Sequence, residues 1–279
     1  MVSVLMPVFN ESKDNLQLSI ESVVNQSYSD FEFIIINDGS NNITTQMLKQ
    51  YTDPRIIIHT LPYNQGISRA LNIGLKLCRG TYILRQDSDN ISSPDRLELF
   101  LTKLQQHNSD LVYSNFSTKS QHKQLTRLEF LPFKMIFFNH IEHNVMYRKQ
   151  VVEELGWYPE SLSRYQDYLL WLKFIMQNKK ISFLDKSLYY YGADKYCVEP
   201  PYEVNTAAYN YTCMLSKRTI NQNTFLNIRK AIRAKQPMNR VQHLVYKNMI
   251  TDFSATLPVG LQASFVNEYY HENSSCIHS

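Results

Sequence analysis

Short apolar runs alternate along the first part of the chain with segments whose apolar residues recur at helical spacing. The apolar runs, several of them rich in β-branched residues, predict strands at residues 2–9, 31–36, 55–60, 81–85 and 111–113. Helical spacing predicts helices at about 16–24, 44–51 and 67–77, and Pro94 is expected to open a further helix. Strands that alternate with helices in this way predict an α/β fold, with a mainly parallel sheet and helices on both of its faces.

Polar residues follow three of the predicted strands. Asn10-Glu11 comes after the first strand, Asp38-Gly39-Ser40 after the second and Asp87-Ser88-Asp89 after the fourth. The carboxyl ends of the strands of an open parallel sheet meet at one crevice, where such folds bind their ligands. Each cluster alone is also typical of an ordinary turn. Their occurrence at three strand ends is what predicts a binding site.

The segment Asp87-Ser88-Asp89 carries two carboxylates at a strand end. Mg²⁺ and Mn²⁺ prefer oxygen ligands, and Mg²⁺ usually takes only one or two protein carboxylates, with phosphate oxygens and water as its other ligands. A cation bound there would neutralise a diphosphate and stabilise it as a leaving group. The sequence therefore predicts Mn²⁺ or Mg²⁺ as a cofactor, with Asp89 and Asp87 as its ligands.

The distribution of charge divides the chain. The net charge of the whole is +4, but residues 1–203 carry 21 Lys/Arg against 22 Asp/Glu, whereas residues 204–279 carry 8 against 3. We therefore predict a catalytic domain at 1–203 and a basic helical region at 204–279, with the boundary near 200–205, where Pro200-Pro201 interrupts regular structure. The function of the first domain comes from the family resemblance given below, which implies that residues 1–110 bind a nucleotide and residues 111–203 an acceptor.

The basic residues of the C-terminal region are interleaved with apolar ones. They are Lys217, Arg218, Arg229, Lys230, Arg233, Lys235, Arg240 and Lys247. Two interpretations stay open: a helical extension with a solvated basic face, or a basic amphipathic surface in peripheral contact with an anionic membrane. A nucleic-acid partner is not expected, because the catalytic domain is close to neutral and contains no recognition motif.

The four cysteines, Cys78, Cys197, Cys213 and Cys276, form no CxxC pair and no Cys/His cluster. This spacing argues against a disulfide framework or a zinc site and favours a reducing, cytoplasmic location. The first residues lack the basic segment of a signal peptide and are expected to form a strand. No apolar run approaches the length of about 20 residues that spans a bilayer.

Six segments, taken in order, resemble family 2 glycosyltransferases. They are VSVLMPVFNE (2–11), SIESVVNQSYSDFEFIIINDGS (19–40), NQGISRALNIGL (64–75), GTYILRQDSDNISSPDRL (80–97), HNVMYRK (143–149) and YQDYLLWLKF (165–174). The resemblance runs from residue 2 to about 183. It implies a GT-A fold, Rossmann-like in its sheet, and inverting transfer of a sugar from a nucleotide-diphosphate donor, most often a UDP-sugar.

The resemblance also implies roles for individual residues. Residues that match the donor site, where nucleotide and sugar bind, are Pro7, Val8, Phe9, Glu11, Asp38, Arg69, Asp87, Ser88 and Asp89. Among them, Phe9 is expected to stack on the base, Asp38 to accept a hydrogen bond from it, and Asp89 to bind the metal. Asp167 matches the catalytic base. His143 matches a position that faces the acceptor, although a structural histidine is an equally good interpretation.

Two positions depart from the family pattern. Gln166 stands where an acid commonly precedes the base, and Asn90 stands where a further aspartate often follows. The absence of a neighbouring charge should make Asp167 easier to ionise. Asparagine at position 90 can still ligate a cation or form hydrogen bonds, so weaker metal binding is expected there and not a loss of activity.

The expected activity is transfer of a sugar to a hydroxyl of a saccharide or lipid-linked saccharide, in the synthesis of cell-surface polysaccharide or lipopolysaccharide. A dinucleotide-dependent oxidoreductase is disfavoured, because Pro7 to Glu11 contains none of the glycines that its first turn requires. Two alternatives stay open: a sugar nucleotidyltransferase, although its usual glycine-rich basic loop is absent, and a catalytically silent nucleotide-binding module. The expected location is the cytoplasm or the inner face of the membrane.

Overall fold

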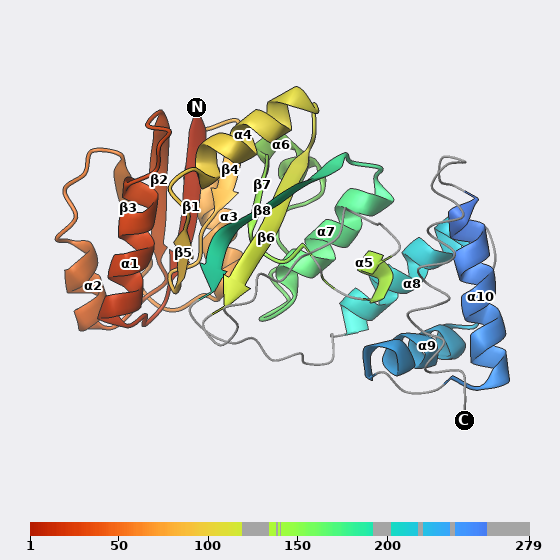
Figure 1. Cartoon of the computed structure of the whole chain (residues 1–279). Coiled ribbons are helices and arrows are strands. Elements are labelled where there is room, and N and C mark those ends of the chain that lie inside the picture. The colour runs from red at the N-terminus through yellow and green to blue at the C-terminus, as the bar shows by residue number, and fades with distance from the viewer. Residues whose placement is uncertain are drawn as a thin grey trace. The chain divides into compact units, whose positions relative to one another are not determined.

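The structure, a computed structural model, describes residues 1–118, 134–137, 139, 141–191, 202–216, 220–234 and 238–255. The chain divides into two compact units (Figure 1). The first comprises Met1–Phe130 with Ile141–Glu199, and the second comprises Leu131–His140 with Pro200–Ser279. Pro200-Pro201, Lys217, Arg218, Lys235, Cys197 and Cys276 lie outside the described residues. The domain boundaries expected from the charge distribution stay a prediction.

The first unit is built on one sheet, whose strand order is β3-β2-β1-β4-β7-β6-β8-β5. The strands are β1 (Val2–Val8), β2 (Phe31–Asn37), β3 (Ile56–Thr60), β4 (Tyr82–Arg85), β5 (Asn90–Ser92), β6 (Leu111–Thr118), β7 (Val145–Arg148) and β8 (Ile181–Tyr191). Strands β3, β2, β1 and β4 are parallel neighbours. Strands β1 and β2 are buried along almost their whole length, as strands covered on both faces must be.

The half of the sheet beyond β4 is mixed. Strand β7 is antiparallel to both β4 and β6, β8 is parallel to β6, and β5 is antiparallel to β8. The prediction of a mainly parallel sheet is confirmed, but strand direction in this half could not be deduced. Apolar periodicity indicates which faces of a strand are buried and carries no information on which neighbour it pairs with.

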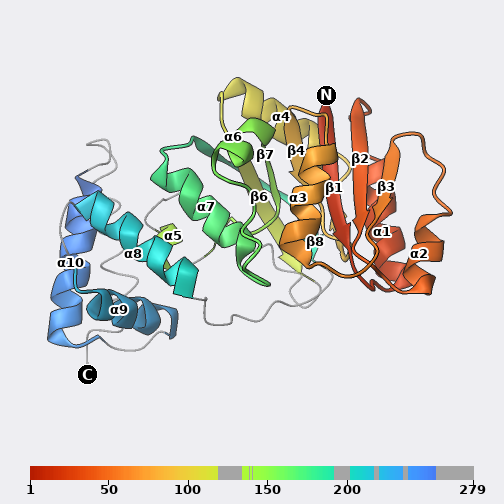
Figure 2. The same cartoon turned by 180° about the vertical axis from the view of Figure 1, so that it is seen from behind.

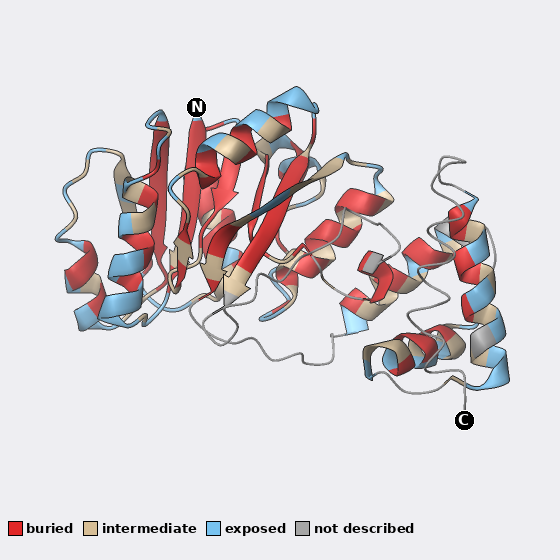
Figure 3. Ribbon diagram, in the orientation of Figure 1, coloured by how far each residue is buried: buried red, intermediate tan, exposed pale blue. Residues whose placement is uncertain are grey.

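Helices cover both faces of the sheet, as predicted. The helices α1 (Lys13–Val24), α2 (Asn42–Leu48) and α4 (Arg96–Gln106) share one apolar core with β1 and β2. Figure 2 shows α3 (Ile67–Leu77), α6 (Lys149–Glu154) and α7 (Gln166–Met176) on the opposite face. In the first unit, Figure 3 shows the buried residues concentrated in the sheet and on the helix faces turned to it.

Three predicted boundaries were wrong. The strand expected at 111–113 is β6, which continues to Thr118. Pro94 does not open helix α4, which begins at Arg96 after Asp95 as its N-cap, because residues 90–92 form the short strand β5 and the chain must first leave the sheet. The helix expected at 44–51 occupies Asn42–Leu48, since the side chain of Asn41 caps its first turn by accepting from the Thr44 amide.

The second unit is helical in its described part, in agreement with the predicted helical extension. It contains α5 (Lys134–Phe137), α8 (Tyr202–Ser216), α9 (Gln222–Ala234) and α10 (Arg240–Ser254). Its buried apolar residues include Phe225 and Ile228 of α9 and Tyr246 and Ile250 of α10. Within the described residues, no helix is long and apolar enough to cross a membrane.

Candidate active site

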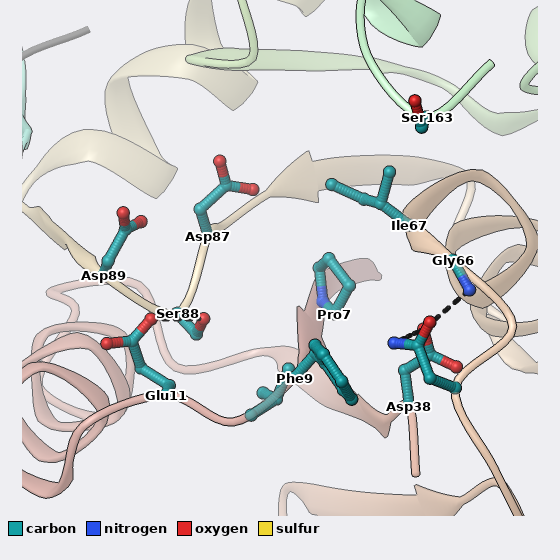
Figure 4. Close-up of a pocket in the computed structure, with 12 residues that line it drawn as sticks. Pro7, Phe9, Glu11, Asp38, Gly66, Ile67, Asp87, Ser88, Asp89 and Ser163 are labelled. Carbon is teal, nitrogen blue, oxygen red and sulfur yellow. Dashed lines mark hydrogen bonds between the residues drawn. The ribbon is translucent and has the colours of Figure 1, made fainter. Parts of the chain in front are cut away.

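A cleft of about 390 Å³ opens beyond the carboxyl ends of the parallel strands. Its lining residues come from the ends of β1, β2 and β4, from the start of α3 and from the segment before α7. They are Pro7, Val8, Phe9, Glu11, Asp38, Asn64, Gly66, Ile67, Asp87, Ser88, Asp89 and Ser163. Figure 4 shows Asp87, Asp89 and Glu11 on one side of the cleft and Asp38 with Gly66 on the other. Eight residues predicted for the donor site are thus brought together here.

The end of β1 supplies an exposed aromatic ring and a fixed acid. Phe9 is 49% exposed although it follows a buried strand, so its ring is available to a planar ligand. Asn10 then takes a left-handed conformation, with φ of 51°, and turns the chain. The carboxylate of Glu11 accepts from the Ser12 amide at 2.9 Å and from Asn15 Nδ2 at 3.0 Å, and the Ser88 hydroxyl lies 3.4 Å from its Oε2.

Asp38, buried at the end of β2, organises the loop in front of α3. Its Oδ1 accepts from the Gln65 amide at 2.7 Å, and its Oδ2 accepts from the Gly66 amide at 2.9 Å and from Asn64 Nδ2 at 3.1 Å. Because a carboxylate offers about four acceptor positions, these three donors leave room for one more. The hydrogen bond expected between Asp38 and the base stays a prediction, and the loop-holding role is an addition to it.

The turn after β2 requires a glycine at position 39. The φ of Gly39 is +65°, and a Cβ built on it would lie 2.3 Å from the backbone carbon of Tyr63 and 2.5 Å from the Asn64 nitrogen. Any side chain at this position would separate the turn after β2 from the loop that Asp38 holds. The close approach of the two backbones therefore fixes one wall of the cleft.

Asp87 is held through both of its carboxylate oxygens. Arg85, at the end of β4, contacts Oδ1 at 2.8 Å, and His143 Nε2 lies 2.9 Å from Oδ2. The side chain of Arg85 is only 2% exposed. Burial works against the charge of Arg85, but Asp87 and the tyrosines Tyr158, Tyr147 and Tyr189 together outweigh it and raise the pKa of the guanidinium. The Asp87 amide donates to the hydroxyl of Tyr189 at 2.9 Å.

A second buried arginine, Arg96, holds the loop after β4 that contains Asp87. Arg96, at the start of α4, donates to Gln86 Oε1 at 3.0 Å, to the Ser92 hydroxyl at 2.8 Å and to the Arg85 carbonyl at 2.8 Å. Gln86 donates to the Asn90 carbonyl at 2.7 Å, which closes the turn. Burial lowers the pKa of Arg96 to about 10, which is still well above neutral pH, so the guanidinium keeps its charge within this network.

The donor set fits a divalent cation that takes most of its ligands from a substrate. Asp87 and Asp89 both line the cleft, but the two oxygens of Asp87 already contact Arg85 and His143. In the part of the chain that the structure describes, no three His, Cys, Asp or Glu side chains gather as a closed metal site. Phosphate oxygens and water would therefore supply the remaining positions, as is usual for Mg²⁺. Asp89, which matches the metal-binding aspartate of the resembling segment, stays the main predicted ligand.

Three predicted site residues lie outside the lining of the cleft. Asp167 is at the first turn of α7, where its Oδ1 accepts from the Tyr168 amide at 2.8 Å. Arg69 is exposed on α3 and is not among the residues that line the cleft. His143, 7% exposed, contacts Asp87, and its expected contact with an acceptor stays a prediction.

Four lining residues were missed: Asn64, Gly66, Ile67 and Ser163. The first three lie in segment 64–75, one of the six that resemble the family, so the sequence could have indicated them as site residues. Ser163 lies in a segment without periodicity, and only the tertiary structure brings it to the cleft. The segment before α7 is therefore closer to the cleft than its distance in sequence indicates.

Comparison with known proteins identifies the family. Residues 3–156, more than half of the chain, match the model described as glycosyl transferase family 2. The chain belongs to glycosyltransferase family 2. The protein is therefore a glycosyltransferase. The sugar nucleotidyltransferase and the silent binding module, left open by the sequence, receive no support from this match.

Curated relatives agree with this assignment. An uncharacterised glycosyltransferase of Methanocaldococcus jannaschii is 31% identical over 205 residues, which are 68% of this chain and 70% of the relative. The O-antigen biosynthesis glycosyltransferase WbnJ of Escherichia coli is 33% identical over 63% of this chain and 72% of its own. A glucosyltransferase of Escherichia coli, WfgD, is 27% identical over 64% of this chain and 71% of its own.

Solved structures share the fold. Residues 1–349 of S. aureus TarS in complex with UDP-GlcNAc match with a TM-score of 0.66 and 18% identity, over 98% of this chain and 90% of that one. The mannosyltransferase PcManGT of Pyrobaculum calidifontis, in complex with GDP-Man and Mn²⁺, matches with a TM-score of 0.58 and 13% identity, over 98% and 86%. At these identities the likeness concerns the fold, which is of the GT-A type as expected.

Proposed function

We propose that this glycosyltransferase transfers a sugar, with inversion, from a UDP-sugar to a hydroxyl of a saccharide or lipid-linked saccharide in the synthesis of a cell-surface polysaccharide or lipopolysaccharide. The observation that carries the proposal is the cleft itself, where Asp38, Asp87 and Asp89 meet at the carboxyl ends of β2 and β4. The WfgD relative is named for a UDP-Glc donor and a diphosphoundecaprenol-linked acceptor, and the TarS structure contains UDP-GlcNAc.

The proposed reaction is a single displacement at the anomeric carbon. The acceptor oxygen forms a bond to that carbon as the bond to the β-phosphate oxygen breaks, and the electron pair of that bond leaves with the nucleoside diphosphate. Asp167 takes the proton of the acceptor hydroxyl, because a carboxylate in hydrogen-bond reach serves as a general base. Phe9 and Asp38 hold the base of the nucleotide, and Asp87 holds the ribose or the sugar.

A divalent cation, Mn²⁺ or Mg²⁺, would offset the charge that grows on the departing diphosphate. Asp89 is the residue of this chain that we propose to hold it. Arg85 and His143 hold Asp87 in place, and with it the loop that contains Asp89. We propose Asp87 as a secondary ligand at most.

A thermal-shift panel tests the donor assignment. We expect UDP with Mn²⁺ to raise the melting temperature more than GDP, ADP or TDP with the same cation, and Asp89→Ala to remove the part of the shift that depends on Mn²⁺. Because the variant keeps the nucleoside pocket, metal-free UDP should bind it as it binds the wild type. Absence of a shift with every nucleotide would contradict the proposal.

A substitution of Asp167 tests the base. Asp167→Asn should lower release of UDP from UDP-glucose or UDP-GlcNAc, with a GlcNAc-diphosphate-lipid as acceptor, by about 10²- to 10⁴-fold, which is the usual contribution of a general base. The affinity for UDP should stay within about twofold, since the residue does not line the donor cleft. Asn227→Asp, at an exposed asparagine of α9, is a matched control. Near wild-type turnover in Asp167→Asn would remove the assignment.

The proposal includes a cytoplasmic location with peripheral contact of the C-terminal unit with an anionic membrane. In support, α10 exposes Arg240 and Lys247 beside Val241 and Leu244, whose exposed fractions are 64% and 58%. Flotation with vesicles of anionic and of neutral lipid tests this contact. Binding only to anionic vesicles, reversed by salt, is expected; absence of binding leaves the solvated basic face as the interpretation.

A further inference from the structure

The segment between α6 and α7 has a conformation that its own sequence does not favour. Gly156, Trp157 and Tyr165 all have positive φ, at 83°, 65° and 63°. Tyr165 is the N-cap of α7 and makes no side-chain capping bond. A left-handed conformation costs a bulky residue about 1–2 kcal/mol, so the surrounding structure must hold this segment in place.

Helix α3 provides the holding contacts. The side chain of Asn72 accepts from the Tyr158 amide at 3.0 Å and donates to the Tyr158 carbonyl at 2.9 Å and to Glu160 Oε1 at 3.0 Å. One turn earlier on the same helix, the Ser68 hydroxyl donates to the Leu162 carbonyl at 3.1 Å. Ser68 and Asn72 are 3% and 6% exposed, so these are buried polar contacts between elements far apart in sequence.

The N-terminal end of α3 belongs to the cleft. Gly66, its N-cap, donates its amide to Asp38 Oδ2, and Ile67, its first residue, lines the cleft. The segment that α3 holds contains Ser163, which also lines the cleft, and it leads within five residues of Leu162 to Asp167. Figure 4 shows Ser163 across the cleft from Asp38, with Ile67 of α3 between them.

We infer that Asn72, assisted by Ser68, is a positioning residue that sets the segment 158–165, and with it Asp167, relative to the donor bound at Asp38. The same helix, α3, thereby contacts both Asp38 and the segment that leads to Asp167. The inference rests on the proposed function of Asp167. Its consequence is a separation of effects: loss of the Asn72 contacts should slow turnover and leave nucleotide affinity unchanged.

The first test removes all three bonds without a large change of volume. Asn72→Leu should lower kcat for release of UDP by about 10- to 100-fold, since a displacement of about 1 Å at a catalytic group has a cost of this order. The Kd of UDP should stay within about twofold, and amide hydrogen exchange at Tyr158 should accelerate. Asn227→Leu and Asn227→Asp, the same changes at an exposed asparagine of α9, are the matched controls for this and the next variant and should change none of these values.

A pair of substitutions at Asn72 and Glu160 tests their contact specifically. Asn72→Asp still accepts from the Tyr158 amide but places a second carboxylate next to Glu160, so kcat should fall by an intermediate factor. Adding Glu160→Gln restores a donor opposite the introduced carboxylate and should recover most of the loss. Glu160→Gln alone should have little effect. If Asn72→Leu does not fold, Ser68→Ala, which removes one bond, should reproduce the pattern at about a 2- to 5-fold reduction.

The outcomes separate this inference from the proposed function. Unchanged exchange at Tyr158, a kcat equal to that of the wild type, or an equal loss of UDP affinity in the Asn72 variants would each overturn the positioning role. Absence of UDP binding or of turnover in the wild-type protein would instead overturn the proposed function, whatever the exchange measurements show.

Discussion

Two acid–arginine pairs lie at opposite ends of the parallel strands and are built in opposite ways. At the carboxyl end, Arg85 is 2% exposed and Asp87 is 20% exposed, so the cation is buried behind an acid that lines the cleft. At the starting end, Glu32 is 5% exposed and Arg79 is 69% exposed, so the acid is buried and the cation lies in solvent.

The two acids, Glu32 and Asp87, also differ in the groups that contact their carboxylates. Glu32 Oε1 accepts from the Ser3 hydroxyl at 2.5 Å and from the Arg79 and Gly80 amides at 2.6 and 3.3 Å, so it joins the starts of β1 and β2 to the turn before β4. The carboxylate of Asp87 instead contacts the side chains of Arg85 and His143. Glu32 accepts from backbone amides, whereas Asp87 contacts two side chains and lines the cleft. The Glu32–Arg79 pair therefore joins strand starts, and the Arg85–Asp87 pair holds a residue of the proposed donor site.

The largest effect is expected at the cleft pair. Asp87→Ala should lower turnover at least about 100-fold, the scale of losing one preorganised electrostatic contact. It should also cost about 3 kcal/mol of unfolding free energy, because Arg85 is left as an unpaired buried charge. Kinetics and urea denaturation measure the two effects.

The double variant Arg85→Met/Asp87→Ala sharpens this prediction. Removal of the buried cation should recover most of the stability and none of the turnover. Recovery of turnover, or stability as low as in the single variant, would show that the two residues do not form the pair described.

A smaller effect is expected at the second contact of Asp87. His143→Ala should lower turnover about tenfold, since a hydrogen bond to a charged group contributes about 1.5–3 kcal/mol. His143→Gln, which retains a donor at a similar position, should recover part of it. A change confined to the KM of the acceptor would instead support the acceptor-side role expected from the sequence.

At the structural pair, turnover should not change. Glu32→Gln keeps an acceptor for the two amides and loses the charge, so we expect a loss of about 1–2 kcal/mol in unfolding free energy and wild-type kinetics. Burial alone would raise the pKa of Glu32, but hydrogen bonds from Ser3 and Arg79 outweigh it and the pKa is lowered. The wild type should therefore lose this stabilisation as the pH falls through that lowered pKa, and the variant should show a flatter dependence. Reduced turnover in the variant would erase the contrast between the two pairs.

The smallest effect concerns Cys78, next to the Glu32 pair. Burial, with a further contribution from Glu32, raises the pKa of this thiol to about 12. Because the thiolate is the reactive form, alkylation of Cys78 at about pH 8 should be much slower than that of the less buried Cys213. Glu32→Gln should accelerate labelling of Cys78 a few-fold, as measured by peptide mass spectrometry.

Much of the fold of residues 1–110 could be predicted because its elements are local. The helix expected at 67–77 is α3, and the strands expected at 31–36 and 81–85 differ from β2 and β4 by one residue at one end. Strand β8 was missed, since its exposed and buried positions do not alternate regularly. Strand β5 was missed because three residues are too few for a periodic pattern.

The candidate site was predicted in part. Residues at the ends of β1, β2 and β4 meet because parallel strands bring their carboxyl ends to one edge, and that rule needs only the order of the elements. Ser163 and Asn72 followed no such rule: their contacts depend on how the segment before α7 packs on α3. No local pattern records a hydrogen bond between residues 86 positions apart.

The sequence by itself determined the family, the α/β class and the acids at the strand ends, because hydrophobic periodicity and short motifs are properties of neighbouring residues. Only the tertiary structure decided that Arg85 and His143 hold Asp87, and that Asp38 holds the loop before α3. Arg85 lies only two residues before Asp87, but no local pattern shows that its side chain is buried against that acid or that His143, far away in sequence, contacts the other oxygen. Buried charges and polar groups need partners, and the fold decides which ones they meet.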